Sequence, residues 1–499
     1  MRAIASFLII LFCIVPIDGM QGVSAETASI VVQAPFDRKA WMDDYGQLKR
    51  ALESSYSHLA WFASPESGVD LPSVDRQALD SLKKARSNAE AKDAIIAFVA
   101  SFRDGHFAQV GAPLTAPQLP DPPLADAFAS GRAACAAFGY AQKTSISFSQ
   151  PFESLRGFHL ATDGTADEFR TGIIDVDGIQ VGIIRIPRFR ASEFPGVCAG
   201  LWESLHREGL SGGPDTITDS VGRAWLEALA GRLRYLRMLG AQFLLVDIGG
   251  NGGGNDLGDW TVRLFSSEPV HSAPLLVTAG QAGVPFLEEQ IENLKTAINK
   301  NENLPEATIT AIERAISDFE RRKSVALSGS CDMSWVWRER RKWGSPGCNR
   351  LVDAGFASGE YDYVDEGSLD SRVAGALYWA SSADGLRGAW EGPVYLLVDD
   401  KTGSAAEMFA ALMRDRDIAR VVGVHTFGDG CGFMVSSGPL ILTHSRLAFA
   451  VPNCVRLRSD GTDEVAGIRP DLDAAPLPGE GSRARAVRIL TMAVSDFRR

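Results

Sequence analysis

The chain has 499 residues, of which 45% are apolar, so it can bury a large core and is long enough for more than one domain. Its formal net charge is −12, and its basic residues form no visible cluster. The composition therefore argues against nucleic acid as a partner, because binding it requires Lys and Arg side chains that neutralise phosphates.

The N-terminal residues have the pattern of a secretory signal peptide. Arg2 gives the segment a positive start, and residues 4–16 form an apolar stretch too short for a stable membrane anchor. Small residues at the spacing of a cleavage site follow and end at Ala25. We predict a signal peptide over residues 1–25, cleavage after Ala25, and an exported protein, periplasmic or secreted, without a stable membrane anchor.

Residues 26–110 are predicted to form an N-terminal helical subdomain. Near its start, five large apolar residues repeat at helical spacing: Trp41, Tyr45, Leu48, Leu52 and Tyr56. A second helix is predicted over residues 88–102, and an Asp-Gly-His turn ending at His106 follows it. Residues 111–170 form a Pro- and Ala-rich connecting region, and its first part holds too many prolines for regular structure.

Residues 171–499 alternate between strand and helix patterns, which predicts an α/β core. Two apolar runs flank Asp177-Gly178, which indicates a hairpin, and a long amphipathic helix should follow. Buried strands are predicted at 243–247 and 394–398, and a helix is predicted to begin at Ser404.

An insertion at about 280–385 interrupts this core. Two apolar stripes at helical spacing, the second opened by Pro305, predict a helical hairpin within it. The hairpin should be followed by a loop that Cys331 and Cys348 close.

Six cysteines remain after the predicted cleavage, and an even number in an exported chain suggests disulfides. Short sequence separation favours the pairs Cys331–Cys348 and Cys431–Cys454, which leaves Cys135–Cys198. The chain has no CxxC pair and no HExxH motif, so we predict neither a metal site nor an organic cofactor.

The segment "DIGGNGGGND" from Asp247 to Asp256 follows a predicted buried strand. Its glycines let backbone N–H groups approach a ligand closely. A phosphate loop would end in Lys and Ser or Thr, and that ending is absent. An oxyanion hole and a flexible turn remain as alternatives.

Ser404 stands at a strand–turn–helix junction, where a nucleophile elbow would place its serine. The same position suits an ordinary helix N-cap, since Glu407 lies at capping-box spacing. A serine nucleophile needs a base, and His106 and His425 are the candidates.

Several motifs in one order carry a resemblance: the glycine loop, "KTGSAAE" around Ser404, "HTFGDG" from His425 and "EVAGIRPDL" from Glu464. They resemble the motifs of the tail-specific (C-terminal-processing) and tricorn-like serine peptidases. The resemblance implies a crotonase-like α/β core of ββα units, with the helical subdomain and the insertion as additions.

The resemblance also implies the residues of an active site. Ser404 matches the nucleophile of the family. The N–H groups of Gly253 and Ala405, with Gly252 close by, match its oxyanion hole.

The two branches of the family differ in their base. The tail-specific branch has a lysine where this chain has Asp429, so a Ser–Lys dyad is absent. In the tricorn-like branch a histidine, oriented through a serine and a glutamate, is the base, and His106 and Glu464 match that histidine and glutamate. The serine before the histidine is replaced by Gly105.

We therefore predict an exported serine peptidase acting on a peptide or protein, with Ser404 as nucleophile, His106 as general base and Glu464 orienting His106. A catalytically inactive ligand-binding protein on the same fold is the alternative. A crotonase-type enzyme acting on thioesters would need a basic site for acyl-CoA phosphates, and no basic cluster is visible. Substrate preference, oligomeric state and the role of the insertion do not follow from the sequence.

Overall fold

The computed structural model describes residues 35–111, 128–165, 168–210, 212–329, 331–435 and 438–499. The predicted signal peptide lies outside these residues. Asp37–Arg499 forms one compact unit. Among the described helices, none combines the length and apolar character that crossing a bilayer requires. The predicted domain boundaries near residues 110 and 170 stay a prediction.

Four helices form the N-terminal part: α1 (Arg38–Ser55), α2 (Leu59–Phe62), α3 (Leu71–Lys84) and α4 (Asn88–Ala100). Helix α1 buries the apolar face that the sequence predicted. Helix α4 begins at Ser87, whose side chain accepts a hydrogen bond from the Glu90 amide as an N-cap. Both helices that were predicted from apolar spacing are therefore confirmed.

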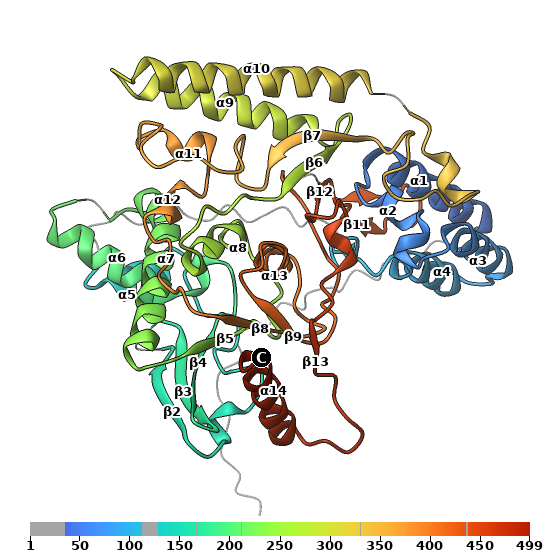
Figure 1. The fold of residues 1–499 in the computed structure, drawn as a ribbon. Coiled ribbons are helices and arrows are strands. Elements are labelled where there is room, and N and C mark those ends of the chain that lie inside the picture. The colour runs from blue at the N-terminus through green and yellow to red at the C-terminus, as the bar shows by residue number, and fades with distance from the viewer. Residues whose placement is uncertain (1–34, 112–127, 166–167, 211, 330, 436–437) are drawn as a thin grey trace, which may run out of the picture. The chain divides into compact units, whose positions relative to one another are not determined.

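A seven-stranded sheet forms the core, in the order β13-β9-β8-β5-β4-β3-β2 (Figure 1). Strands β4, β5, β8, β9 and β13 are parallel, and β2, β3 and β4 are antiparallel neighbours. The predicted turn at Asp177-Gly178 joins β3 to β4. The strands are β2 (Phe158–Asp163), β3 (Arg170–Val176), β4 (Ile179–Arg185), β5 (Phe243–Asp247), β8 (Val394–Val398), β9 (Arg420–Gly423) and β13 (Leu472–Asp473).

Helices cover both faces of this sheet, because alternate strand residues point to opposite sides. Helices α7 (Pro214–Met238) and α13 (Ala405–Asp415) pack on the face that carries Leu244, Val246, Leu396 and Val398. Helix α14 (Ser482–Phe497) packs on the face that carries Phe243, Leu245, Tyr395 and Leu397. These two apolar layers confirm the α/β class.

The insertion contains the predicted helical hairpin, formed by α9 (Val284–Lys300) and α10 (Glu306–Ser328). Strands β6 (Pro274–Thr278) and β7 (Leu351–Phe356) flank it and pair with each other, and β6 also pairs with β12 (Cys454–Arg456). This second sheet was not predicted from the sequence, because its strands are short and Val277 of β6 pairs with Cys454 of β12, far downstream in the chain.

The remaining elements are short. A third sheet joins β1 (Gln109–Val110), β11 (Ala448–Phe449) and β10 (Leu440–Ile441). Strand β1 begins at Gln109, shortly after His106, so its pairing with β11 fixes the histidine segment to the C-terminal part of the core. The other helices are α5 (Gly131–Ala137), α6 (Pro195–Arg207), α8 (Leu257–Trp260), α11 (Ala374–Leu377) and α12 (Ser381–Asp384).

All three predicted disulfides are present: Cys135–Cys198, Cys331–Cys348 and Cys431–Cys454. The first joins α5 to α6, and the third joins β12 to the loop that follows β9. Each therefore links two segments that the core does not hold together by sheet hydrogen bonds alone.

A buried ion pair joins the N-terminal helices to the core. His58 and Asp463 are both fully buried, and His58 Nδ1 lies 2.8 Å from Asp463 Oδ2. His58 Nε2 lies 2.9 Å from the Cys431 carbonyl oxygen. Burial lowers the pKa of His58, but the Asp463 carboxylate outweighs this and raises it to about 9. Since a carbonyl and a carboxylate only accept, the imidazole donates from both nitrogens and is charged.

Replacing His58 by Leu should lower the free energy of unfolding by about 3–5 kcal/mol near pH 7, because Asp463 would stay buried without its cation. The ion pair contributes fully below the unfolded-state pKa of about 6.5. Its contribution is lost as the pH rises through about 9. Urea denaturation should therefore show that the difference in the free energy of unfolding between wild type and variant becomes smaller from pH 6.5 to pH 9.5.

His159→Leu is the matched control, because His159 is exposed on β2. It should change the free energy of unfolding by less than about 0.5 kcal/mol at either pH. A gap for His58→Leu that does not change with pH would contradict the charged pair.

Candidate active site

The candidate site lies where three parallel strands end. The glycine-rich loop follows β5, Ser404 follows β8, and residues 425–432 follow β9. Strands β5, β8 and β9 are adjacent and parallel, so their carboxyl ends meet at one edge of the sheet. Loops at such an edge are the usual place for a site in an α/β protein.

The glycine-rich loop is fixed through Asn251, which is fully buried. Its Oδ1 accepts the Gly253 N–H at 2.8 Å, and its Nδ2 donates to the Ile186 carbonyl at 3.0 Å. Its own carbonyl accepts the Gly403 N–H at 3.0 Å. One side chain and its backbone thus tie together the segments after β4, β5 and β8, which argues against the flexible-turn alternative.

Gly253 lies directly against Ser404. It has a φ of +92°, and a Cβ at this position would lie 2.6 Å from Ser404 Cβ and 2.7 Å from the Ala405 nitrogen. Only glycine fits this approach. Within the described residues, the N–H groups of Gly252 and Ala405 have no hydrogen-bond acceptor, whereas that of Gly253 donates to Asn251.

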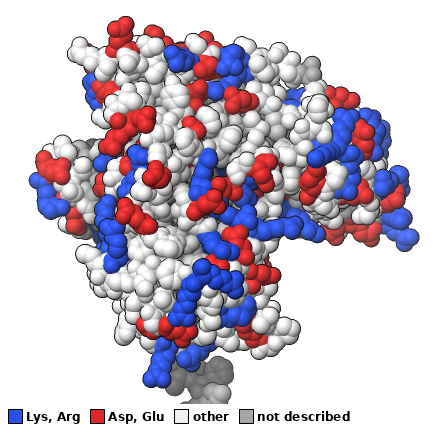
Figure 2. Space-filling view, viewed as in Figure 1, with Lys and Arg blue, Asp and Glu red and all other residues white. Residues whose placement is uncertain are grey.

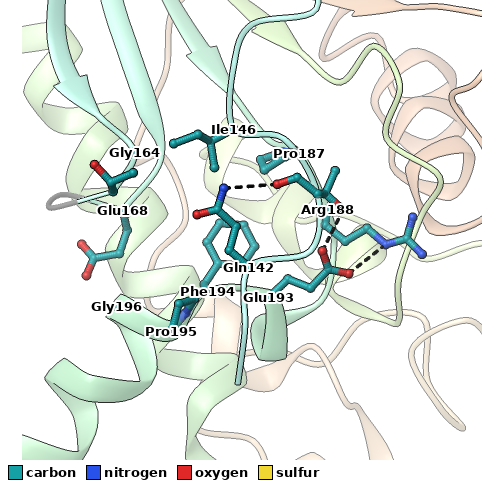
Figure 3. Close-up of a pocket in the computed structure, with 12 residues that line it drawn as sticks. Gln142, Ile146, Gly164, Glu168, Pro187, Arg188, Glu193, Phe194, Pro195 and Gly196 are labelled. Carbon is teal, nitrogen blue, oxygen red and sulfur yellow. Dashed lines mark hydrogen bonds and ion pairs between the residues drawn. The ribbon is translucent and has the colours of Figure 1, made fainter. Parts of the chain in front are cut away.

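Arg188 was not identified from the sequence, because no motif contains it. It lies after β4, and a Cβ on Gly252 would lie 2.9 Å from its Nη1. Its Nε is 3.5 Å from Glu193 Oε1, and Glu193 Oε2 accepts the Thr144 hydroxyl at 2.7 Å. Figure 3 shows this pair in the pocket next to the loop. A cation therefore lies beside Gly252, one residue of the predicted oxyanion hole.

Ser404 begins helix α13 in a strained conformation. Its φ is +56° and its ψ is −124°, a region that non-glycine residues rarely adopt. Such strain costs about 1–3 kcal/mol and persists where the surrounding structure enforces it, often at functional sites. The Ser404 N–H donates to Glu407 Oε2 at 3.2 Å, so the capping-box description of the helix start also holds.

Glu407 has a larger role than a cap. It is fully buried, and it accepts hydrogen bonds from Thr426 Oγ1 at 2.5 Å, the Gly428 N–H at 2.7 Å and the Asp429 N–H at 2.8 Å. Burial raises the pKa of Glu407 to about 7, and these hydrogen bonds act in the opposite direction. Glu407 thereby joins the start of the Ser404 helix to the loop after β9. From the sequence, only the capping role of Glu407 was predicted.

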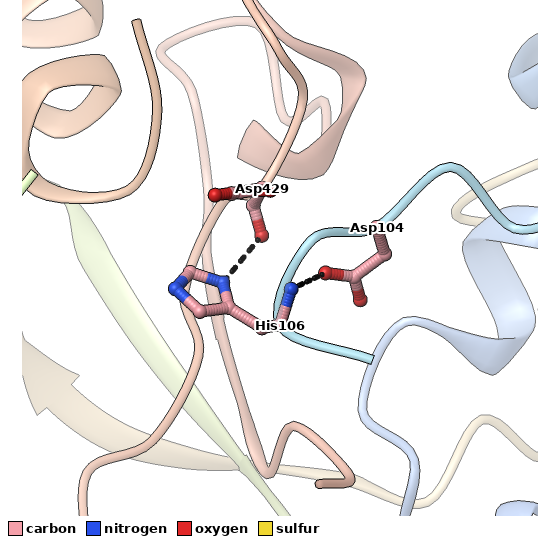
Figure 4. Close-up of side chains that lie close together, drawn as sticks. All are labelled: Asp104, His106 and Asp429. Carbon is pink, nitrogen blue, oxygen red and sulfur yellow. Dashed lines mark hydrogen bonds between the residues drawn. The ribbon is translucent and has the colours of Figure 1, made fainter. Parts of the chain in front are cut away.

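His106 is held by contacts on both sides of its ring. Its Nδ1 lies 3.2 Å from the Asp429 carbonyl oxygen, and its backbone N–H donates to Asp104 Oδ1 at 2.9 Å (Figure 4). The ring packs against Gly432, where a Cβ would lie 2.8 Å from His106 Cδ2. Since a carbonyl only accepts, Nδ1 carries the proton, and the Nε2 lone pair of the neutral ring is free to accept one.

The Asp429 carboxylate lies between the segments that carry the serine and the histidine. Its Oδ1 accepts the Gly105 N–H at 2.8 Å. A Cβ on Gly105 would lie 2.3 Å from Oδ1, and one on Gly403 would lie 2.9 Å from Oδ2. The residues that precede His106 and Ser404 therefore contact the same carboxylate, and this contact leaves no room for a serine at position 105.

Asp104, His106 and Asp429 form a close cluster, with one ligand atom of each within 4.8 Å of the others. Burial raises the pKa of Asp429, while a positive charge on His106, when its ring is protonated, opposes that shift. Asp104 Oδ2 accepts the Tyr56 hydroxyl at 2.7 Å, so a buried tyrosine holds the turn before His106. Acidic clusters are common without metals, and nothing else here indicates a bound ion.

The structure gives Glu464 a different partner from the one predicted. Its carboxylate accepts two hydrogen bonds from Arg456, Nε at 2.7 Å and Nη2 at 2.9 Å, and both residues are buried. Within the described residues, Glu464 makes no hydrogen bond to His106. Arg456 Nη2 also donates to the Gly430 carbonyl at 3.2 Å, so Glu464 acts on the loop of Asp429 through this arginine.

His425, the other candidate base, is exposed. Its Nδ1 lies 2.8 Å from the Thr426 carbonyl oxygen, and the residue lines a cavity that Phe427 also lines. The Asp429 carboxylate contacts Gly105 and Gly403, the residues before His106 and Ser404, and within the described residues no contact of it with His425 is found.

Comparison with known proteins follows this geometry. The model of peptidase family S41 matches residues 180–474, more than half of the chain. No significant match is found among curated proteins.

Among solved structures, mature CPAF matches with a TM-score of 0.53 and 13% identity, over 92% of this chain and 97% of that one. Mature CPAF complexed with lactacystin matches with a TM-score of 0.54 and 14% identity, over 92% and 98%. The photosystem II D1 C-terminal processing protease gives a TM-score of only 0.31 at 14% identity, over 89% and 96%. At these identities the CPAF similarity concerns the fold. The family match confirms the resemblance that the motifs predicted: the chain belongs to peptidase family S41 and is a serine-type peptidase.

Proposed function

We propose that this peptidase is exported and cleaves peptide bonds with Ser404 as nucleophile and His106 as general base. The observation that carries the proposal is the Asp429 carboxylate, which contacts both the residue before Ser404 and the residue before His106. The strained backbone of Ser404 supports the same role. An inactive ligand-binding protein would require neither feature and is not favoured.

In the proposed reaction, Ser404 Oγ attacks the carbonyl carbon of the scissile bond while His106 Nε2 takes the hydroxyl proton. The carbonyl oxygen becomes an oxyanion, which the N–H groups of Gly252 and Ala405 stabilise. His106 then gives its proton to the leaving amine as the carbon–nitrogen bond breaks. A water molecule hydrolyses the acyl-enzyme by the same steps, with His106 again as base. No metal or organic cofactor takes part.

The Gly253 N–H, predicted as an oxyanion donor, has a supporting part in this proposal. Because it donates to Asn251, it holds the loop in the conformation that exposes the Gly252 N–H. Gly253 itself contributes mainly by its close approach to Ser404. The hole is then formed by the Gly252 and Ala405 amides, with Arg188 nearby.

Asp429 takes the positioning role that the sequence analysis gave to Glu464. Its carbonyl fixes the tautomer of His106, and its carboxylate stabilises the imidazolium that forms during attack. Glu464 keeps an indirect role, since its ion pair with Arg456 supports the Gly430 carbonyl in the same loop.

The proposal also includes a crotonase-like core and export of the protein. Strands β3 and β4 followed by α7 form a ββα unit, which supports a crotonase-like core. The three disulfides support export, because such bonds persist mainly in oxidising compartments.

Ser404→Ala should abolish labelling of the purified protein by a fluorophosphonate probe, because the probe reacts with an activated serine hydroxyl. Peptide cleavage should fall by at least about 10⁴-fold. The measurement is in-gel fluorescence together with turnover of a quenched-fluorescence peptide library. Ser324→Ala, at an exposed serine of α10, serves as the control and should label like wild type. Labelling that survives Ser404→Ala would rule out this nucleophile.

His106→Ala should lower kcat by about 10³-fold or more with little change in KM, since the base acts in the chemical step. His425→Ala should change kcat less than about threefold. Steady-state kinetics with one fluorogenic peptide would compare them. If His425→Ala removed turnover while His106→Ala retained it, the assignment of the base would be wrong.

Asp429→Asn should lower kcat by about 10-fold to 100-fold, because an amide keeps the shape but cannot stabilise the imidazolium. KM and the free energy of unfolding should change little, since the Asn oxygen still accepts the Gly105 N–H. Kinetics and urea denaturation of the same sample separate the two effects. Asp93→Asn, an equal change of charge at an exposed residue of α4, is the control. A loss confined to stability, with kcat intact, would show that Asp429 is only structural.

A further inference from the structure

A second cavity borders the loop that carries Asp429. It has a volume of about 540 Å³ and lies between the N-terminal helices and the C-terminal part of the core. Its size is typical of pockets that bind small ligands or several peptide residues. Phe62 and Phe102 line one side, and Phe427 and Gly428 line the other.

Phe427 connects this cavity to the catalytic residues. Its side chain is 49% exposed although it is large and apolar. A Cβ on Gly105 would lie 2.6 Å from its Cε1, and one on Gly403 would lie 3.8 Å from its Cβ. Phe427 thus contacts the residues that precede both His106 and Ser404. A peptide bound at Ser404 needs only a few residues to reach the cavity across this ring.

The cavity also presents cations. Four arginines line it, and two of them are neutralised: Arg414 pairs with Asp471 at 2.9 Å, and Arg458 pairs with Asp415. Arg103 and Arg469 are exposed and have no ion-pair partner within the described part of the chain. Figure 2 shows basic side chains gathered in the middle of this face, between helices α3 and α4 and strands β9 and β13.

The carboxylates on the wall do not neutralise these two arginines. Glu66 accepts the Trp343 N–H at 3.3 Å, and Asp460 accepts the Thr462 N–H at 2.8 Å. Neither forms an ion pair with Arg103 or Arg469 among the described residues. Two free guanidinium groups beside aromatic rings therefore remain, a combination that suits carboxylates on a partly apolar peptide.

We propose that this cavity is a substrate subsite that binds carboxylate groups of a peptide through Arg103 and Arg469. The carboxylates come from Asp or Glu side chains near the scissile bond or from the C-terminus of the substrate. The proposal rests on the proposed function, since it names the substrate class of the same site. The net charge of −12 repels acidic peptides at long range, so the two arginines act locally, within about one Debye length.

Three fluorogenic peptides of one sequence separate the two sources of the carboxylate. The first has Glu residues flanking the cleaved bond and an amidated C-terminus, the second has Gln at those places, and the third has Gln and a free C-terminus. For wild type, at least one of the two carboxylate-bearing peptides should have a higher kcat/KM than the neutral peptide. The peptide that is preferred identifies the source.

The double variant Arg103→Glu/Arg469→Glu should reduce the ratio of kcat/KM between the preferred peptide and the neutral peptide by at least about 10-fold, mainly through KM. Arg234→Glu/Arg483→Glu is the matched control, because both arginines are exposed, on α7 and α14, and the pair makes the same change of charge outside the cavity lining. An unchanged ratio in Arg103→Glu/Arg469→Glu, or an equal fall in the control double variant, would overturn the proposal.

A binding measurement keeps this test separate from the catalytic assignment. Fluorescence anisotropy of the labelled Glu peptide and the labelled free-C-terminus peptide with Ser404→Ala reports the cavity without any turnover. The affinity for the preferred peptide should fall at least about 10-fold when Arg103→Glu/Arg469→Glu is added, and less at high salt. If the fluorophosphonate probe failed to label wild type, the proposed nucleophile would fail while this result would still decide the cavity.

Discussion

The arrangement of the site depends on one buried carboxylate, that of Glu407. Five donors face it: the amides of Ser404, Gly428, Asp429 and Gly430 and the hydroxyl of Thr426. A buried carboxylate without such donors would cost several kcal/mol. The loop after β9 must therefore close over the start of α13, and this closure places the Asp429 backbone where His106 meets it. The strain at Ser404 is held by the same contacts.

The Asp429 and Gly105 pair shows how one substitution constrains another. An aspartate replaces the lysine of the tail-specific branch, and its carboxylate fills the space that a side chain at position 105 would occupy. A serine there would clash, so glycine is required, and its N–H donates to the aspartate. In the sequence these were two separate departures from the family motifs. In space they are a single contact that links the histidine segment to the serine.

Much of the fold follows from local patterns, because periodic apolar residues report burial directly. The helices at residues 41 and 88, the hairpin at Asp177 and the buried strand before the glycine loop all have such patterns. The second sheet was missed because β6, β7 and β12 are short and pair across the whole insertion. Pairing over that distance leaves no local signal.

The residues of the candidate site also divide into those with a local sequence signal and those without one. Ser404 and His106 stand in motifs, so the sequence alone could name them as candidates. The role of Glu464 in orienting His106 stays a prediction, and the structure adds a partner that the motifs did not indicate: Arg456, eight residues before Glu464, donates to both of its oxygens. Glu407 was assigned only to a cap, because its other partners are about twenty residues away and visible only in the folded chain. Which atom accepts a hydrogen bond depends on tertiary contacts, and sequence spacing does not report them.

The N-terminal helices help to hold the candidate site in place. A buried ion pair as well as apolar contacts attaches them to the core. His58 holds a charge in a fully buried position only while Asp463 faces it, and Asp463 is the residue before Glu464. Tyr56, two residues before His58, donates to Asp104 in the turn before His106. The short segment from Tyr56 to His58 thus contacts both the turn before His106 and the loop that carries Glu464. Separating the helices from the core would leave the charged His58 and the Asp463 carboxylate without their partners. We therefore expect His106 to keep its position relative to Ser404.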